Sequence, residues 1–103
     1  MQPCVYMMAS KRHGTIYIGA TSDLSAREWE HVSRAKPKSF TARYNVRRLV
    51  WFEDHETMAS ALQREKSLKR WRRQWKIDLI ESVNPHWHPL DVETGQWVRA
   101  VYI

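Results

Sequence analysis

One pair of side chains in this sequence has the types and the spacing needed to act on a phosphodiester. Arg27 and His31 are four residues apart, so on a helix they project from the same face about one turn apart. Arginine clamps phosphate oxygens with a fork of N–H donors, and histidine exchanges a proton near neutral pH. Arginine and histidine also occur together on ordinary solvated helix faces, so the pair alone leaves both interpretations open.

Glu65 is a second candidate, because it interrupts the apolar stripe of a predicted helix. The stripe runs in steps of four, three and three through Met58, Leu62, Glu65 and Leu68. A carboxylate at such a position requires an ionic partner or a metal ion. A single carboxylate, together with water and phosphate oxygens, suits Mg²⁺ or Mn²⁺. The alternative is a plain salt bridge to Lys69 or Arg27.

Positive charge gathers immediately around and after Glu65. Lysine or arginine occupies seven of the thirteen positions from 64 to 76, and Trp71 and Trp75 interrupt the run. A basic helix with interleaved aromatic residues can follow a nucleic-acid backbone, although a solvated face with core tryptophans has the same pattern. We expect four of these residues to contact nucleic acid: Lys69, Arg70, Arg72 and Arg73.

Net charge and composition narrow the class of protein. Seventeen Lys and Arg against eleven Asp and Glu give a net charge of +6 and a pI near 9.8. This charge suits a polyanionic partner, and equally a merely soluble basic protein. Cys4 is the single cysteine, so no internal disulfide or cysteine metal cluster is expected. The 103 residues suit one domain. Because membrane-spanning and signal-peptide patterns are missing, we expect a cytoplasmic protein without a membrane partner.

Two runs near the start of the chain predict a β-hairpin. Residues 4–9 and 15–19 are rich in apolar, β-branched and aromatic residues, and the polar segment 10–14 separates them. Tyr6 and Tyr17 come together if the hairpin pairs them opposite each other. The sequence allows this register but does not determine it.

The elements that follow the hairpin predict an α+β fold, a small three-stranded antiparallel sheet with flanking helices in the order β-β-α-β-α-α. Before the third strand we expect a helix capped by Ser22 or Asp23 and reaching about Arg34, a loop at 36–38 and a short helical turn at 40–45. After that turn we expect a strand at 48–53. Asp54 is expected to cap the next helix, which starts near Glu56 and continues, or restarts after a kink, to Val83. A late strand at 96–103 is expected after a Thr94-Gly95 turn.

Taken in order, these residues resemble the GIY-YIG nuclease superfamily, in particular its small stand-alone bacterial members with a URI-type domain. The resemblance covers about residues 3–90, so we assign 1–90 to this domain and 91–103 to a C-terminal extension. Val5-Tyr6-Met7 stands at the family's first tripeptide and keeps only its tyrosine, whereas Tyr17-Ile18-Gly19 matches the second tripeptide fully. The other matching positions are Arg27 with Glu30-His31 on the first helix, the Phe40–Tyr44 and Arg48–Trp51 segments, Glu65 within Ala61–Lys66, and Asn84-Pro85.

The resemblance implies a metal-dependent endonuclease that hydrolyses DNA phosphodiester bonds with Mg²⁺ or Mn²⁺. It implies that Glu65 holds the metal ion, that Arg27 neutralises the phosphate, and that a tyrosine assisted by His31 orients or deprotonates the attacking water. The six residues with implied catalytic roles are Tyr6, Tyr17, Arg27, His31, Glu65 and Asn84. Gly19 joins the residues that we expect to contact nucleic acid.

Two other functions remain open at this point. The chain could be a nucleic-acid-binding module that keeps the fold but cuts little or nothing, or a nuclease directed at RNA. Larger members of the superfamily use additional domains for targeting, so a partner protein or a homodimer could direct this chain to its substrate.

Overall fold

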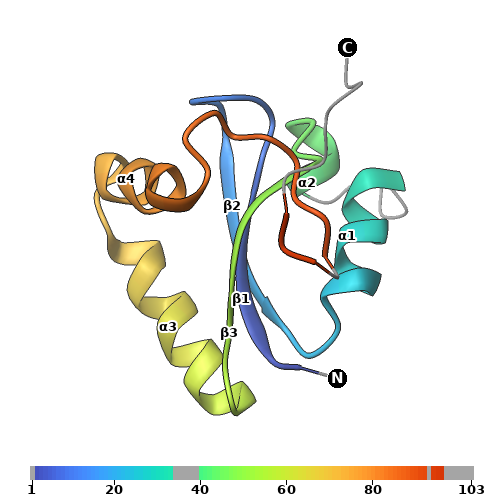
Figure 1. The fold of residues 1–103 in the computed structure, drawn as a ribbon, viewed down its shortest axis with the longest axis vertical. Helices are drawn as coiled ribbons and strands as arrows, with labels where there is room; N and C mark the ends of the chain where they lie inside the picture. The colour runs from blue at the N-terminus through green and yellow to red at the C-terminus, as the bar shows by residue number, and fades with distance from the viewer. Residues whose placement is uncertain (1, 34–39, 93, 97–103) are drawn as a thin grey trace.

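The computed structural model describes residues 2–33, 40–92 and 94–96 of the chain. At its centre lies a three-stranded antiparallel sheet of β1 (Cys4–Ala9), β2 (Ile16–Thr21) and β3 (Arg48–Asp54), in the order β2-β1-β3. Figure 1 shows α3 and α4 on one side of this sheet and α1 on the other. The predicted α+β class and element order are confirmed, with the four-residue helix α2 (Phe40–Arg43) as an addition inside the predicted turn.

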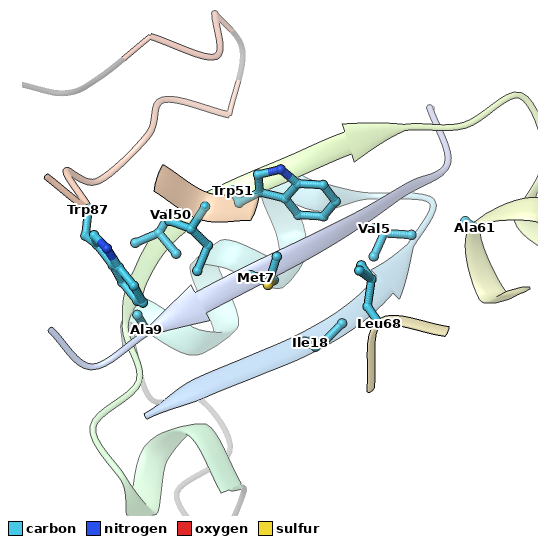
Figure 2. Close-up of a cluster of buried hydrophobic side chains, with 10 residues drawn as sticks. Val5, Met7, Ala9, Ile18, Val50, Trp51, Ala61, Leu68 and Trp87 are labelled. Carbon is cyan, nitrogen blue, oxygen red and sulfur yellow. The ribbon is translucent and has the colours of Figure 1, made fainter. Parts of the chain in front are cut away.

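The central strand β1 is buried along its whole length, because helices or chain segments cover both faces of the sheet. Its odd-numbered residues Val5, Met7 and Ala9 belong to a core cluster that also includes Ala61 and Leu68 of α3 (Figure 2). Its even-numbered side chains point to the opposite face, as alternation along a strand requires. This second face carries the candidate catalytic side chains of the hairpin.

The second face of the sheet is covered by α1 and by the chain that follows α4. Tyr6 and Met8 of β1 form a buried cluster there with Leu90, and Leu24 at the start of α1 packs against the cluster. Helix α1 (Leu24–Ser33) begins where predicted, since the Oδ1 atom of Asp23 accepts a hydrogen bond from the backbone N–H of Ala26 at 3.2 Å. The predicted loop at 36–38 and the helix end at Arg34 lie outside the described residues.

The long basic segment forms two helices, α3 (Met58–Arg70) and α4 (Arg73–Val83), with a break at Trp71. The start of α3 differs from the prediction, because Thr57 and not Asp54 is its cap: the Thr57 hydroxyl accepts from the backbone N–H of Ser60 at 3.1 Å. Helix α4 ends at Val83, as Asn84-Pro85 predicts.

The apolar stripe predicted for α3 was wrong in one respect. The residues that α3 buries are Ala61 and Leu68, whereas Leu62 is 48% exposed. The sheet-facing stripe therefore passes through Ala61, Glu65 and Leu68, at steps of four and three. Glu65 lies on the inward side of the helix, so its carboxylate needs an ionic partner or a metal ion there.

The chain after α4 returns along β3 and then turns. The backbone N–H of Leu90 donates to the carbonyl of Leu49 at 2.9 Å, and Asp91 and Gln96 close the predicted turn, in which Gly95 has a φ of 71°. The strand expected at 96–103 falls almost entirely outside the described residues. Within the part of the chain that the structure describes, no helix has the length and apolar character needed to cross a membrane.

Candidate active site

Two tyrosines of the hairpin lie on the same face of the sheet, on adjacent strands. They are not directly opposite each other, because Tyr6 pairs with Gly19 and Tyr17 pairs with Met8. The two rings are diagonal neighbours in this register, and their centroids are 6.2 Å apart. The hairpin thus brings the tyrosines together through a diagonal contact, in place of the directly opposite pairing that the sequence allowed.

Gly19 makes the diagonal contact between the tyrosines sterically feasible. A Cβ atom built on Gly19 would lie 2.6 Å from both the Cζ atom and the hydroxyl oxygen of Tyr6. The Tyr6 ring therefore lies against the bare backbone of its cross-strand partner. This buried position gives Gly19 a role in seating Tyr6, whereas its contact with nucleic acid stays a prediction.

Gly19→Ala is expected to lower the free energy of unfolding by about 1–3 kcal/mol, because the added methyl group overpacks the space that the Tyr6 ring fills. Chemical denaturation measures this cost. The control is the same substitution in a Tyr6→Val background, where the ring is gone and the cost should largely disappear. An equal cost in both backgrounds would contradict the proposed seating of Tyr6.

Helix α1 brings His31 to the two tyrosines. The Nε2 atom of His31 lies 3.2 Å from the Tyr6 hydroxyl, and the His31 ring centroid is 6.0 Å from that of Tyr6 and 5.3 Å from that of Tyr17. We call Tyr6, Tyr17 and His31 the tyrosine–histidine cluster. Three residues that are separated in sequence thus form one group on the α1 side of the sheet.

Protonation within the cluster follows from the burial of Tyr6. Desolvation by burial raises the pKa of Tyr6 far above its usual value, and the neighbouring Tyr17, by its charge and by a side-chain hydrogen bond, raises it further. Tyr6 therefore stays neutral and keeps its hydroxyl proton, and its hydroxyl group forms a hydrogen bond with the Nε2 atom of His31. Tyr17 is partly exposed and Tyr6 is 2% exposed, so Tyr17 is the tyrosine that water can reach.

Arg27 lies one turn before His31 on α1. Its guanidinium charge acts on Tyr6, lowering that residue's pKa against the larger effect of burial. One guanidinium nitrogen, Nη1, pairs with the Glu30 carboxylate at 3.0 Å, while 44% of the Arg27 side chain is exposed. Arg27 is therefore a solvent-accessible cation beside the tyrosine–histidine cluster, available to a phosphate.

Glu65 lies on α3, the helix that packs on the other face of the sheet. Its side chain is 19% exposed, and one of its carboxylate oxygens, Oε1, pairs with the Nζ atom of Lys69 at 3.7 Å. The buried residues Ala61 and Leu68 mark the direction in which α3 faces the sheet. Because successive residues of a helix are rotated by about 100°, the Arg64 side chain projects about 50° to one side of this direction and the Glu65 side chain about 50° to the other. Arg64 binds Glu53 of β3, so Glu65 leans toward the outer strand β2.

The donor set around Glu65 suits a hard divalent ion. The described residues contain no group of three or more His, Cys, Asp or Glu side chains that could hold a metal ion, so a zinc site of closed protein ligands is not built here. The Glu65 carboxylate is single and partly buried, and it pairs with the positively charged Lys69. Such a carboxylate suits Mg²⁺ or Mn²⁺, because these ions complete their coordination with water and phosphate oxygens. Glu65 is the residue that would hold such an ion.

Asn84 is buried away from the tyrosine–histidine cluster. Its side-chain amide donates to the carbonyls of Val50 at 3.0 Å and of His88 at 2.8 Å, and its carbonyl accepts from the backbone N–H of His88 at 3.0 Å. The side chain is fully used in tying the end of α4 to β3. These contacts give Asn84 a positioning role in the fold, and the catalytic role expected for it stays a prediction.

Asn84→Ala is expected to lower the free energy of unfolding by about 2–4 kcal/mol, because it leaves several buried backbone groups without partners. Thermal unfolding followed by circular dichroism measures the loss. If the variant unfolds at the parent temperature and has lost its activity, Asn84 acts in the chemistry and the positioning role is wrong.

The predicted nucleic-acid-binding residues of α3 and α4 differ in their surroundings. Lys69, Arg70 and Arg72 are exposed, and the Arg72 guanidinium lies 5.3 Å from the ring centroid of Trp75, itself 50% exposed. Arg73 instead donates from Nη2 to the carbonyls of His13 and Gly14, both at 2.7 Å, and so fastens α4 to the hairpin loop. Trp71 packs partly into the core, so one of the two tryptophans is a surface residue.

Sequence comparison places these features in a family. Residues 2–78 match the family model described as the GIY-YIG catalytic domain. The chain belongs to the GIY-YIG family. The matched range includes the tyrosine–histidine cluster, Arg27 and Glu65, and it ends before Asn84.

Relatives of this GIY-YIG chain include proteins named UPF0213. Those of Staphylococcus aureus strains Mu3 and N315 are each 35% identical over 68 residues, which are 66% of this chain and 82% of theirs. The solution NMR structure of a UPF0213 protein from Bacillus halodurans has 26% identity and a TM-score of 0.49, covering 80% of this chain and 85% of that one.

Proposed function

We propose that this chain is a divalent-metal-dependent endonuclease that hydrolyses DNA phosphodiester bonds. The observation that carries the proposal is the meeting of Tyr6, Tyr17 and His31 beside the exposed Arg27, with Glu65 on α3, the helix that packs on the other face of β1 and β2. Membership in the GIY-YIG family supports nucleic acid as the partner. The net charge of +6 agrees with a polyanionic substrate.

The tyrosine–histidine cluster orients the attacking water in this proposal. The Tyr17 ring is partly exposed and lies beside the buried Tyr6 and beside His31, so its hydroxyl is the tyrosine group of the cluster that a water molecule can reach. The neutral Tyr6 keeps its proton and does not act as a base, since its pKa is raised. Tyr17 therefore contacts the nucleophile, and Tyr6 and His31 hold Tyr17 in place.

Charge stabilisation is assigned to Arg27 and Glu65. The Arg27 fork binds the non-bridging oxygens of the scissile phosphate, whose negative charge grows as the bond to the water forms. Glu65 would hold a divalent ion, which when bound would supply Lewis-acid stabilisation of the leaving oxygen. Glu30 holds Arg27 at 3.0 Å when no phosphate is present, and a phosphate would compete for the same guanidinium.

The exposed cations of α3 and α4 provide a surface for the rest of the substrate. Lys69, Arg70 and Arg72 carry charges available to phosphates, and the ring of Trp75 offers an exposed aromatic face next to Arg72. Arg73 links this surface to the β1–β2 loop, so the binding surface contacts the loop that joins the two strands bearing the tyrosines.

Incubation with plain duplex, single-stranded, flapped and four-way-branched DNA, and with RNA, tests the proposal. Cleavage of a DNA substrate that requires Mg²⁺ or Mn²⁺ and stops with a chelator is the expected result. Cleavage of RNA but of none of the DNA substrates would change the proposed substrate from DNA to RNA. Salt-sensitive binding without cleavage of any substrate would contradict the endonuclease proposal and favour a binding module that acts with a partner protein.

A further inference from the structure

A cluster of ionic and hydrogen-bonding groups joins the start of α3 to the end of β3, and the proposed function makes no use of it. Glu53 lies near the end of β3, and one of its carboxylate oxygens contacts two nitrogen atoms. These are the Nε2 atom of His55 at 2.7 Å and the Nε atom of Arg64 at 3.2 Å. The other ring nitrogen of His55, Nδ1, bonds the Ser60 hydroxyl in the first turn of α3. These contacts fix the Glu53 carboxylate from two sides.

Arg64 is held on two sides as well. Its guanidinium pairs with both oxygens of Glu53, at 3.2 and 3.5 Å, and its Cζ atom lies 5.2 Å from the centroid of the Trp71 ring. A bidentate pair with a stacked guanidinium has one preferred orientation, unlike the single contact that a lysine makes. Arg64 therefore adds a directional contact to β3, which helps to set the rotation of α3 about its own axis together with the buried Ala61 and Leu68.

Rotation of α3 about its axis determines where the Glu65 carboxylate lies. Arg64 and Glu65 are consecutive and flank the sheet-facing direction marked by Ala61 and Leu68. At a radius of about 5–6 Å, a rotation of about 10° moves a side-chain end by about 1 Å, and a 1 Å misplacement can cost about 100-fold in rate. A contact that fixes Arg64 toward β3 thus also fixes Glu65 toward β2.

We propose that Glu53 and Arg64 are positioning residues that hold the Glu65 carboxylate at the β2 edge of the sheet, where a divalent ion is bound. This inference rests on the proposed function, because it assigns Glu65 the metal ion. His55 supports Glu53 in this arrangement, and Trp71 supports Arg64. The proposal gives none of the four a contact with substrate, so their effect on the reaction is expected to pass through Glu65.

The test compares Glu53→Gln with Glu56→Gln, a matched control that removes the same charge from an exposed glutamate three residues away. Mn²⁺ binding to the full chain is measured from the electron paramagnetic resonance signal of the free ion, and single-turnover cleavage is measured at saturating Mn²⁺. Glu53→Gln is expected to raise the Mn²⁺ dissociation constant about fivefold or more and to slow cleavage about 10- to 100-fold. Glu56→Gln should stay within about twofold of the parent in both, by the usual small effect of surface changes.

Two further measurements separate positioning from general loss of structure. Arg64→Lys keeps the charge but loses the fork, so it should shift the Mn²⁺ affinity in the same direction even where Glu53→Gln folds poorly. In a Glu65→Ala background, Glu53→Gln should cause no additional loss of Mn²⁺ affinity, because the two residues act as one unit.

Unchanged Mn²⁺ affinity and cleavage rate in folded Glu53→Gln and Arg64→Lys would overturn the positioning role while leaving the proposed function intact. A lower melting temperature with unchanged affinity would also overturn it, since Glu53 would then serve stability alone. If the parent chain neither binds Mn²⁺ nor cuts, the proposed function fails, and the positioning role fails with it.

Discussion

Glu65→Ala is expected to slow metal-dependent cleavage by about 1000-fold or more, because the change removes the carboxylate proposed to hold the divalent ion. The loss corresponds to about 4 kcal/mol of transition-state stabilisation, within the several kcal/mol that a Lewis-acid ion supplies. DNA affinity measured without metal should change little, since removing a negative charge from a basic surface does not weaken contacts to phosphates. Single-turnover cleavage and fluorescence anisotropy measure the two quantities.

The control for Glu65→Ala is Glu56→Ala, the same substitution at an exposed position just before α3. It should cut at the parent rate. Glu65→Ala also breaks the contact to Lys69 at 3.7 Å, but a single long contact to an exposed lysine contributes little to stability. A Glu65→Ala variant that cuts as fast as its control would remove Glu65 from the site.

Arg27→Ala is expected to slow cleavage by about 100- to 1000-fold, the usual loss when one preorganised donor to a developing negative charge is removed. The affinity for DNA should fall only modestly, because several exposed cations on α3 and α4 remain. Arg27→Lys should recover only part of the rate, since an ammonium group lacks the fork that binds two phosphate oxygens. The measurement is the cleavage rate at saturating DNA, together with the dissociation constant.

Arg47→Ala is the matched control for Arg27→Ala, because Arg47 is an exposed arginine outside the proposed site. It tests whether the loss of one positive charge anywhere on the chain slows cleavage. Equal losses in the two variants would show a general charge effect and would contradict a transition-state role for Arg27.

Much of the fold was predictable because local signals agreed with each other. The strand at 4–9 has the same bounds in the structure, and Asp23 caps α1 by the expected contact. The start of α3 was misplaced because Asp54 and Thr57 are both good caps, and only tertiary contacts select Thr57. The apolar stripe of α3 was misjudged because Leu62 fits the same periodicity as Ala61, and periodicity alone does not show which of two adjacent faces meets the sheet.

The candidate site was predictable in composition but not in arrangement. Residue types and spacing indicated Arg27 and His31, and the family resemblance indicated Tyr6 and Tyr17, yet hairpin register decides that the tyrosines meet diagonally. The roles of Gly19 and Asn84 depend on neighbours that are distant in sequence, Tyr6 for one and Val50 for the other. Arg64 was counted only as one charge of a basic run, since its pairing with Glu53 gives no local sequence signal.

The most direct test of the central claim is to add the metal ion to a single sample and then remove it again. The unmodified chain is mixed with labelled DNA and a chelator, excess Mn²⁺ is added, and the chelator is later restored in excess, while products are followed throughout. The account predicts no product before Mn²⁺, steady cleavage while the ion is free, and an immediate stop when it is removed. Product formation in the chelator phase, or none in any phase despite demonstrated DNA binding, would contradict a metal-dependent endonuclease.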